Sequence, residues 1–211
     1  MHIADGILPV SLCVAGYAMS LTAAAIGSRK LQTEEVPRMG MLAAATFVAS
    51  CVHIPIAGSS VHFGLLGLLG AMLGLRSVPV VVAVLLLQSF LFQHGGFLTL
   101  GVNALNMGAG ALSGYLLWRM NRLPLGLRGF LAGFAGMMVP ALLVMLEFQT
   151  AGYGRSLLVL TGVYALLGIL EGGFTSMVLT FLQRTRPNML GLATPPQSFV
   201  GVASQPEGPS A

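Results

Sequence analysis

The feature that most constrains this chain is the length of its uncharged stretches. No Asp, Glu, Lys or Arg occurs between Arg38 and Arg76, or between Arg76 and Arg119. The whole chain of 211 residues has ten Lys and Arg and six Asp and Glu, or 8% charged residues, against roughly 25% in a soluble domain. Because so few charges cannot cover a soluble surface, and the mean hydropathy is +0.87, we predict an all-α integral membrane protein.

The uncharged runs also predict how many helices cross the membrane. A helix needs about 20 predominantly apolar residues to span the hydrocarbon core. Seven runs approach that length, which predicts a single bundle of about seven transmembrane helices. The predicted spans are Val10 to Ser28, Met39 to Ala57, Ser60 to Leu75, Val78 to Gln93, Gly101 to Trp118, Gly129 to Phe148 and Ser156 to Gln183.

The basic residues predict the orientation of this bundle, because Lys and Arg collect in cytoplasmic loops. Nine of the ten follow the first, third, fifth and seventh predicted spans, and only Arg155 does not. We therefore expect the N-terminus outside and the C-terminus inside. The nine are Arg29, Lys30, Arg38, Arg76, Arg119, Arg122, Arg128, Arg184 and Arg186.

Two features set the domain limits and exclude one activity. Residues 187–211 are rich in Pro, Gly, Ser and Gln, which predicts a flexible cytoplasmic tail after a single membrane domain of residues 1–186. Lys30 is the only lysine and does not lie in a Walker A motif, so P-loop ATP hydrolysis is excluded. Cys13 and Cys51 lie in apolar runs and indicate no disulfide framework.

The N-terminus has the groups of a metal chelate. The α-amine of Met1, the backbone nitrogen of His2 and its imidazole can close two fused rings around one divalent ion. A tetragonal all-nitrogen site favours Ni(II) or Cu(II), with Co(II) less obviously favoured. A fourth nitrogen is needed to complete it. The alternative is that His2 is only an interfacial histidine, since histidine chemistry alone does not require a metal.

The other three histidines favour the metal interpretation. His53, His62 and His94 all map to the outer side of the predicted topology, the same side as His2. Either His62 or His94 can supply the missing nitrogen. The alternative is that the Gly-rich outer turns simply tolerate polar residues.

Several motifs resemble one family. Met1-His2-Ile3-Ala4-Asp5-Gly6-Ile7-Leu8-Pro9 resembles the N-terminus of the CbiM/NikM family, the substrate-binding (S) components of energy-coupling factor (ECF) transporters for cobalt and nickel. The similarity continues up to about Arg186. The other matching blocks are Ile54 to His62, His94 to Asn103, and Leu170-Glu171-Gly172-Gly173.

The resemblance implies a non-enzymatic subunit that captures Co(II) or Ni(II) at the outer face of the cell inner (plasma) membrane. It implies no permanent cofactor. It implies metal ligands from Met1, His2 and His62. The implied partners are a transmembrane coupling (T) subunit, cytoplasmic ABC-type ATPase subunits and a small accessory membrane subunit, with no nucleic acid. A family role in cobalt uptake for cobalamin biosynthesis follows from the same resemblance.

Other polar residues are candidates for supporting the ligands. His94, Asn103, Asn106 and His53 are predicted to orient the ligating groups, which metal-bound histidines commonly need. His53 does not belong to the expected family pattern. For the asparagines, an ordinary interhelical hydrogen bond is the alternative. Glu171, in the middle of the last span, is expected to face protein rather than lipid.

Two other functions are alternatives. An S component for an organic micronutrient would need an aromatic, polar pocket, and the only tryptophan is Trp118 at the predicted inner end of its helix. An intramembrane serine protease based on Ser113 lacks a histidine base in the last two spans. Nickel and cobalt are not separated by the sequence.

Overall fold

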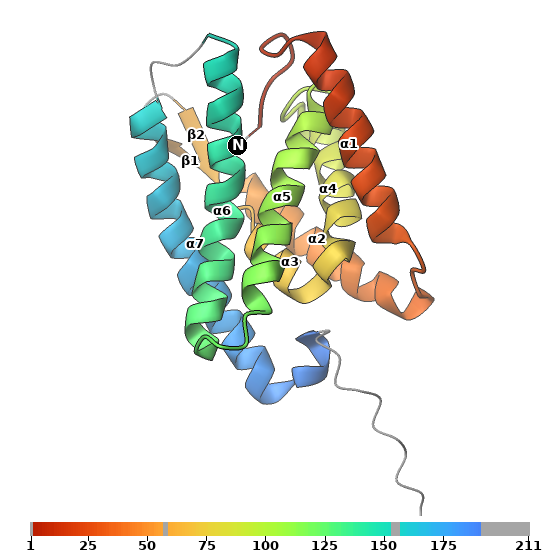
Figure 1. The fold of residues 1–211 in the computed structure, drawn as a ribbon, viewed down its shortest axis with the longest axis vertical. Coiled ribbons are helices and arrows are strands. Elements are labelled where there is room, and N and C mark those ends of the chain that lie inside the picture. Colours follow the sequence, from red (N-terminus) through yellow and green to blue (C-terminus); the bar gives the residue numbers. More distant parts are fainter. Residues whose placement is uncertain (1, 57–58, 153–156, 191–211) are drawn as a thin grey trace, which may run out of the picture.

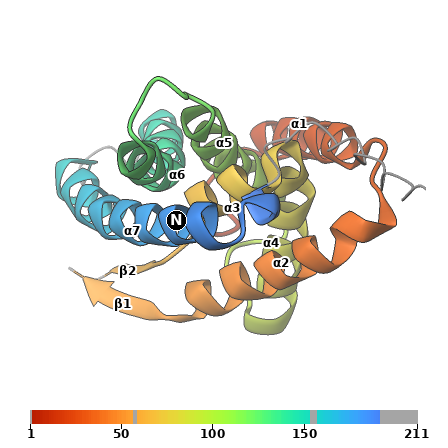
Figure 2. The same cartoon turned by 90° about the horizontal axis from the view of Figure 1, so that it is seen from below.

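The computed structural model describes residues 2–56, 59–152 and 157–190, which form a bundle of α-helices (Figure 1). Figure 2 shows the short helix α3 in the middle of this bundle, with longer helices around it. The helices are α1 (Val10–Ser28), α2 (Val36–Cys51), α3 (Leu66–Leu73), α4 (Ser77–Phe92), α5 (Leu100–Trp118), α6 (Leu125–Thr150) and α7 (Leu157–Thr185), and one hairpin joins β1 (His53–Ile56) to β2 (Ser59–His62).

The prediction of a helical membrane bundle is confirmed, with fewer full-length spans than expected. Within the described residues, four helical segments are long and apolar enough to cross a membrane. Helix α1 has the bounds that hydropathy predicted. The four segments are Val10–Ser28, Leu66–Phe92 (α3, the 3-10 turn Gly74–Arg76 and α4 taken together), Leu125–Thr150 and Leu160–Thr185.

The predicted span Ser60 to Leu75 is wrong, because the structure divides it into a strand and a short helix. Helix α3 has 8 residues, about 12 Å at 1.5 Å per residue, well short of the roughly 30 Å hydrocarbon core. Leu65 has a positive φ of 49° before the helix and Gly74 one of 57° after it. Because both backbones leave the right-handed helical region, α3 cannot extend in either direction.

The predicted span Met39 to Ala57 is also wrong at its C-terminal end. Helix α2 ends at Cys51, and residues 53–56 pair antiparallel with residues 59–62 in a register that places His53 opposite His62. Pro55 cannot donate the backbone hydrogen bond that a helix needs, and β-branched Ile54 and Ile56 favour strands. The hairpin ends at His62, four residues before α3 begins.

Helix α3 packs backbone to backbone against its neighbours, which explains part of the glycine content. A Cβ atom on Gly70 would lie 1.7 Å from the carbonyl oxygen of Ala111 on α5, and one on Gly67 would lie 2.1 Å from that of Ala132 on α6. Small residues allow this close approach of helices inside a membrane. Larger side chains at these positions would therefore prevent the short helix α3 from packing this closely against α5 and α6.

We expect Gly70→Ala to destabilise the bundle by about 1–3 kcal/mol, the usual cost of overpacking. Its methyl group has no space against the α5 backbone. Gly173→Ala is the matched control, since a Cβ there meets nothing within 4 Å and alanine favours helix. Thermal unfolding of the purified protein in detergent measures both; equal melting temperatures for the two variants would contradict the packing described.

The basic residues of the described chain gather at one end of the bundle. Arg76 donates to the carbonyl oxygens of Gly27 and Arg29, each at 2.6 Å, and forms an ion pair with Glu35 at 3.1 Å. Arg128 lies over the ring of Trp118, 4.5 Å from its centroid. The Arg76 contacts join the end of α1 to the residues just before α2 and α4, and the Arg128 contact joins the start of α6 to the end of α5. In Figure 1 this is the lower end.

The first residues of the expected flexible tail have a regular structure. Pro187–Leu190 forms a 3-10 turn after α7. Leu190 is 2% exposed and packs in a cluster with Trp118 and Leu179, because an apolar side chain near the bundle gains by leaving water. Residues 191–211, the rest of the expected tail, lie outside the described residues.

Candidate metal centre

Three histidines from distant parts of the chain meet inside the bundle. His2 belongs to the N-terminal segment, His62 ends β2, and His94 follows α4. One ring nitrogen from each lies within 4.8 Å of the others. The His2 ring stacks on His62 with centroids 5.0 Å apart, and His94 meets His2 edge-on at 4.5 Å. Two opposite nitrogens on one ion are about 4.2 Å apart at metal–nitrogen distances near 2.1 Å, so small movements suffice to bind one.

The backbone determines which nitrogen His62 offers to an ion. The side chain is 2% exposed, and its Nδ1 lies 3.1 Å from the carbonyl oxygen of Phe63. Because a carbonyl can only accept, Nδ1 carries the proton and donates it. Nε2 then has the lone pair, which is the form of a histidine that binds metal. A hydrogen bond on the second ring nitrogen is the usual way in which proteins orient such a ligand.

The N-terminal segment is held inside the bundle next to the cluster (Figure 1). Ile3 is fully buried and packs with Cys13, Val102 and Val144 of α1, α5 and α6. Asn103 binds the backbone of Ile3 twice, accepting from its N–H at 2.9 Å and donating to its carbonyl oxygen at 3.0 Å. The Asn103 side chain, on α5, thus makes the two hydrogen bonds that the backbone of a neighbouring strand would make with Ile3. This pairing fixes the residue next to His2.

A second set of contacts joins the N-terminal segment to the loop that carries His94. Thr99 donates its hydroxyl to the Ile3 carbonyl oxygen at 2.6 Å, and its N–H donates to Asp5 at 3.0 Å. A Cβ on Gly95, where φ is +80°, would lie 3.3 Å from Cβ of His2, and one on Gly96 would lie 1.8 Å from the Asp5 carboxylate. The two glycines therefore let the loop close directly over the segment.

The residues predicted to support the ligands have different partners in the structure. Asn103 holds the N-terminal segment rather than an imidazole, whereas Asn106 donates to Glu147 at 2.8 Å. His94 lies in the cluster itself, in a position to bind the ion. His53 pairs by its backbone with His62, but its side chain lies outside the described residues. Met1, the predicted amine ligand, also lies outside them.

Glu171 connects α7 to the start of the half-helix α3. Its side chain is fully buried, and Oε1 accepts hydrogen bonds from the N–H groups of Gly64 and Leu65. These donors lie at the N-terminus of α3, where backbone N–H groups lack helical partners and a carboxylate is favoured. The expectation that Glu171 faces protein is confirmed. Its partners are backbone groups two and three residues after His62.

Asp5, Thr99 and Glu147 have contacts in the structure that were not predicted from the sequence. Asp5 is the only charged residue before Arg29, and an isolated carboxylate beside an apolar helix indicates a specific partner. That signal was present in the sequence. Thr99 and Glu147 had no comparable signal, because their partners are distant in the chain.

The cluster is suited to holding a late first-row divalent ion rather than to acid–base catalysis. Imidazole is a common ligand of Zn, Cu, Fe and Ni ions. Ser113, the nucleophile of the protease alternative, donates to the carbonyl oxygen of Gly110 at 2.7 Å within its own helix. This is an ordinary helical contact and gives the hydroxyl no base.

Comparison with known proteins agrees with this picture. The chain is 36% identical over 214 residues to the cobalt transport protein CbiM of Sorangium cellulosum, covering 90% of this chain and 94% of that protein. It is 32% identical over 200 residues to a protein of Archaeoglobus fulgidus provisionally named fused nickel transport protein NikMN, covering 90% and 68%. Two further curated relatives are matched over 60% and 61% of their own lengths.

The fold and a family description match as well. A crystal structure described as that of a transition metal transporter superimposes with a TM-score of 0.79 at 24% identity, covering 87% of this chain and 93% of that one. Residues 2–189 match the description of CbiM, cobalt uptake substrate-specific transmembrane region. This chain therefore belongs to the CbiM family of multi-pass membrane components for cobalt and nickel transport.

Proposed function

We propose that this chain captures Ni(II) or Co(II) at the outer face of the cell inner (plasma) membrane, for ATP-driven uptake by partner subunits. The observation that carries the proposal is the convergence of His2, His62 and His94, with ring nitrogens within 4.8 Å of one another. The α-amine of Met1 and the backbone nitrogen of His2 would complete a nitrogen-rich site, with His62 as the third ligating residue. Such a ligand set suits late first-row ions.

The charge distribution supports the proposed orientation. The arginines with described contacts, including Arg76 and Arg128, lie at the end of the bundle away from the hairpin and the N-terminal segment (Figure 1). Basic residues favour the cytoplasmic side. With that end inside, the histidine cluster lies toward the outer side of the membrane. The bundle then has about seven helical elements, of which α3 is too short to span.

Uptake against a gradient needs an energy source, and the sequence contains no P-loop lysine motif of its own. The proposal therefore includes cytoplasmic ABC-type ATPase subunits and a transmembrane coupling subunit of the ECF type, with a small accessory membrane subunit. The basic inner end, with Arg119 and Arg122 between α5 and α6 and Arg128 in the first turn of α6, is the surface proposed to face these partners or anionic lipid.

The experiment is metal binding by the purified chain with its native N-terminus, compared with a variant extended by one alanine before Met1. The extension moves the α-amine away from His2, and we expect Ni(II) and Co(II) affinity to fall at least about 100-fold. Equilibrium dialysis with metal quantified by mass spectrometry measures it. Unchanged binding by the extended protein would contradict coordination by the amine, and competition between the two ions at fixed pH identifies the preferred one.

A further inference from the structure

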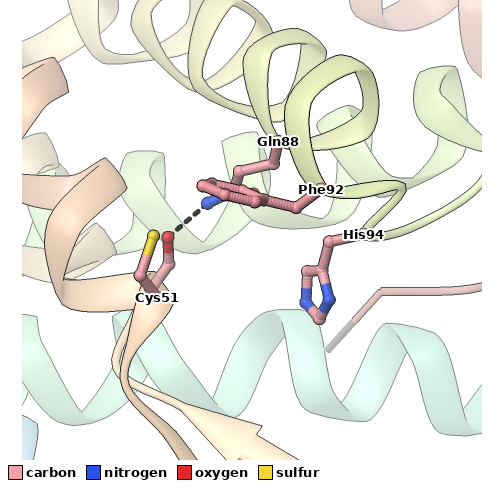
Figure 3. A pocket seen from close by; sticks show the side chains of 5 residues that line it. Cys51, Gln88, Phe92 and His94 are labelled. Carbon is pink, nitrogen blue, oxygen red and sulfur yellow. Dashed lines mark hydrogen bonds between the residues drawn. The ribbon is translucent and has the colours of Figure 1, made fainter.

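Two histidines of the cluster have different surroundings. His94 lines a cavity of about 260 Å³ between the C-terminal ends of α2 and α4 (Figure 3), so its ring has open space on one side. His62 ends a strand and is only 2% exposed, so the groups packed around it decide how its ring is oriented. A ligand that is oriented before the ion binds loses less freedom on binding. The contacts of His62 therefore affect the affinity of the centre.

One peptide group lies between the His62 ring and Glu171. Its carbonyl oxygen, that of Phe63, accepts the hydrogen bond from Nδ1 of His62 at 3.1 Å. Its N–H, that of Gly64, donates to Oε1 of Glu171. Because a peptide group is a rigid plane with its C=O and N–H on opposite sides, these two contacts hold the plane at both ends. Rotation of the peptide would break both of them.

The next residue is held by the same carboxyl oxygen. The N–H of Leu65 also donates to Oε1 of Glu171, at 3.1 Å, so two successive N–H groups converge on one atom. Leu65 has a φ of 49°, which a residue other than glycine keeps only where its surroundings hold it. Glu171 is fully buried and belongs to α7. A side chain of α7 thus fixes the turn that follows His62.

The shared peptide also transmits an electrostatic effect. Hydrogen bonds in a chain polarise one another, so an N–H that donates to a carboxyl oxygen makes the carbonyl of its own peptide a better acceptor. A better acceptor at Phe63 favours the proton on Nδ1 of His62 and leaves the lone pair on Nε2. An acceptor on the second ring nitrogen orients a metal-binding histidine and raises its basicity. Glu171 therefore acts on both the orientation and the tautomer of the ring.

We propose that Glu171 is a positioning residue of the metal centre. Through the Phe63–Gly64 peptide, it holds the His62 ring in one orientation and with Nδ1 protonated, so that Nε2 is ready to bind Ni(II) or Co(II). The inference rests on the proposed function. It assigns Glu171 no contact with the ion, since its carboxyl group binds the N–H groups of Gly64 and Leu65.

Three substitutions of Glu171 test this assignment in the full chain with its native N-terminus. Glu171→Leu has no acceptor, Glu171→Asp keeps an acid that is one methylene shorter, and Glu171→Gln keeps an oxygen at the same reach. Equilibrium dialysis measures the Ni(II) affinity. We expect it to fall about 10-fold in Glu171→Leu and Glu171→Asp, at the lower end of the usual loss for a ligand's partner, and to stay within about 3-fold in Glu171→Gln.

The tautomer of His62 is a second readout, which a merely structural role of Glu171 would not change. In metal-free protein with isotope-labelled histidine, the nitrogen NMR shifts identify which ring nitrogen has the proton. His62→Ala assigns the signals. We expect Nδ1 to be protonated in the native protein and in Glu171→Gln, and a mixture of the two tautomers in Glu171→Leu and Glu171→Asp.

Thr175→Val is the matched control, because it removes a fully buried hydroxyl one turn further along α7. It should change neither readout. Native affinity in Glu171→Asp, or an equal loss in Glu171→Gln, overturns the assignment, since the position of the accepting oxygen would then not matter. These two variants decide the question even if Glu171→Leu does not fold.

The two readouts must also agree. Lost affinity with an unchanged tautomer overturns the assignment, because Glu171 would then act by another path than the His62 ring. A changed tautomer with native affinity overturns it as well. If the native protein binds no Ni(II), the proposed function fails, whereas the NMR shifts still show whether Glu171 orients His62.

Discussion

Replacing His62 with alanine is expected to lower the affinity for Ni(II) or Co(II) by at least about 100-fold. Groups that only support a ligand typically cost 10–100-fold when mutated, and His62 offers the lone pair of Nε2 directly to the cluster. Equilibrium dialysis gives the affinity. Bound metal should also raise the melting temperature of the native protein, because a ligand stabilises the state that binds it, and His62→Ala should lose most of that rise.

Ser113→Ala is the control for this experiment. Ser113 lies within α5, and its hydroxyl donates to the carbonyl oxygen of Gly110. Metal affinity and the metal-dependent stabilisation should both be unchanged in this variant. Retention of native affinity by His62→Ala would contradict the assignment of the cluster as the capture site.

Asn103→Leu is expected to weaken metal binding by about 10-fold or more, although Asn103 does not belong to the cluster. Leucine has a similar size but cannot pair with the N–H and carbonyl groups of Ile3. Each buried backbone group left without a partner costs about 1–3 kcal/mol. The N-terminal segment would then leave its position more often, taking His2 with it. Dialysis measures the affinity, and limited proteolysis near the N-terminus measures the release.

Asn106→Leu is the matched control, three residues further along the same helix. Asn106 binds Glu147 and not the N-terminal segment. Its loss should lower the melting temperature without changing metal affinity beyond that effect. If both variants lost affinity equally, the special role of Asn103 as the clamp on Ile3 would be wrong.

Hydropathy predicted the long helices well because it reports a local property. In α1 and α5, the hydropathy of each residue depends on its own side chain alone. The first and last apolar residues of the run therefore predict where the helix begins and ends. His2, His62 and His94 were also all identified, because polar residues at the ends of apolar runs are conspicuous. Of the predicted ligands and supporting residues, the described structure brings His2, His62 and His94 together, whereas Met1 and the side chain of His53 lie outside the described residues.

Hydropathy failed where apolar residues are buried for another reason. The segment from Ser60 to Leu75 is as apolar as a membrane span, yet it forms β2 and the half-helix α3. Its side chains avoid water by packing inside the protein rather than by facing lipid, and composition does not distinguish the two. The polar groups that such a broken segment exposes are satisfied by Glu171, more than 100 residues away.

By itself, the sequence determined that this chain is a membrane protein, where its long helices begin, which side of the bundle is basic, and which nitrogen-bearing residues are candidates for a metal. These follow from the local chemistry of charge and hydropathy. Only the tertiary structure decided that the N-terminal segment folds into the bundle, clamped by Asn103 and Thr99, and that His94 joins the cluster. Those outcomes depend on backbone groups finding partners far along the chain, since inside a membrane each of them must be satisfied by protein.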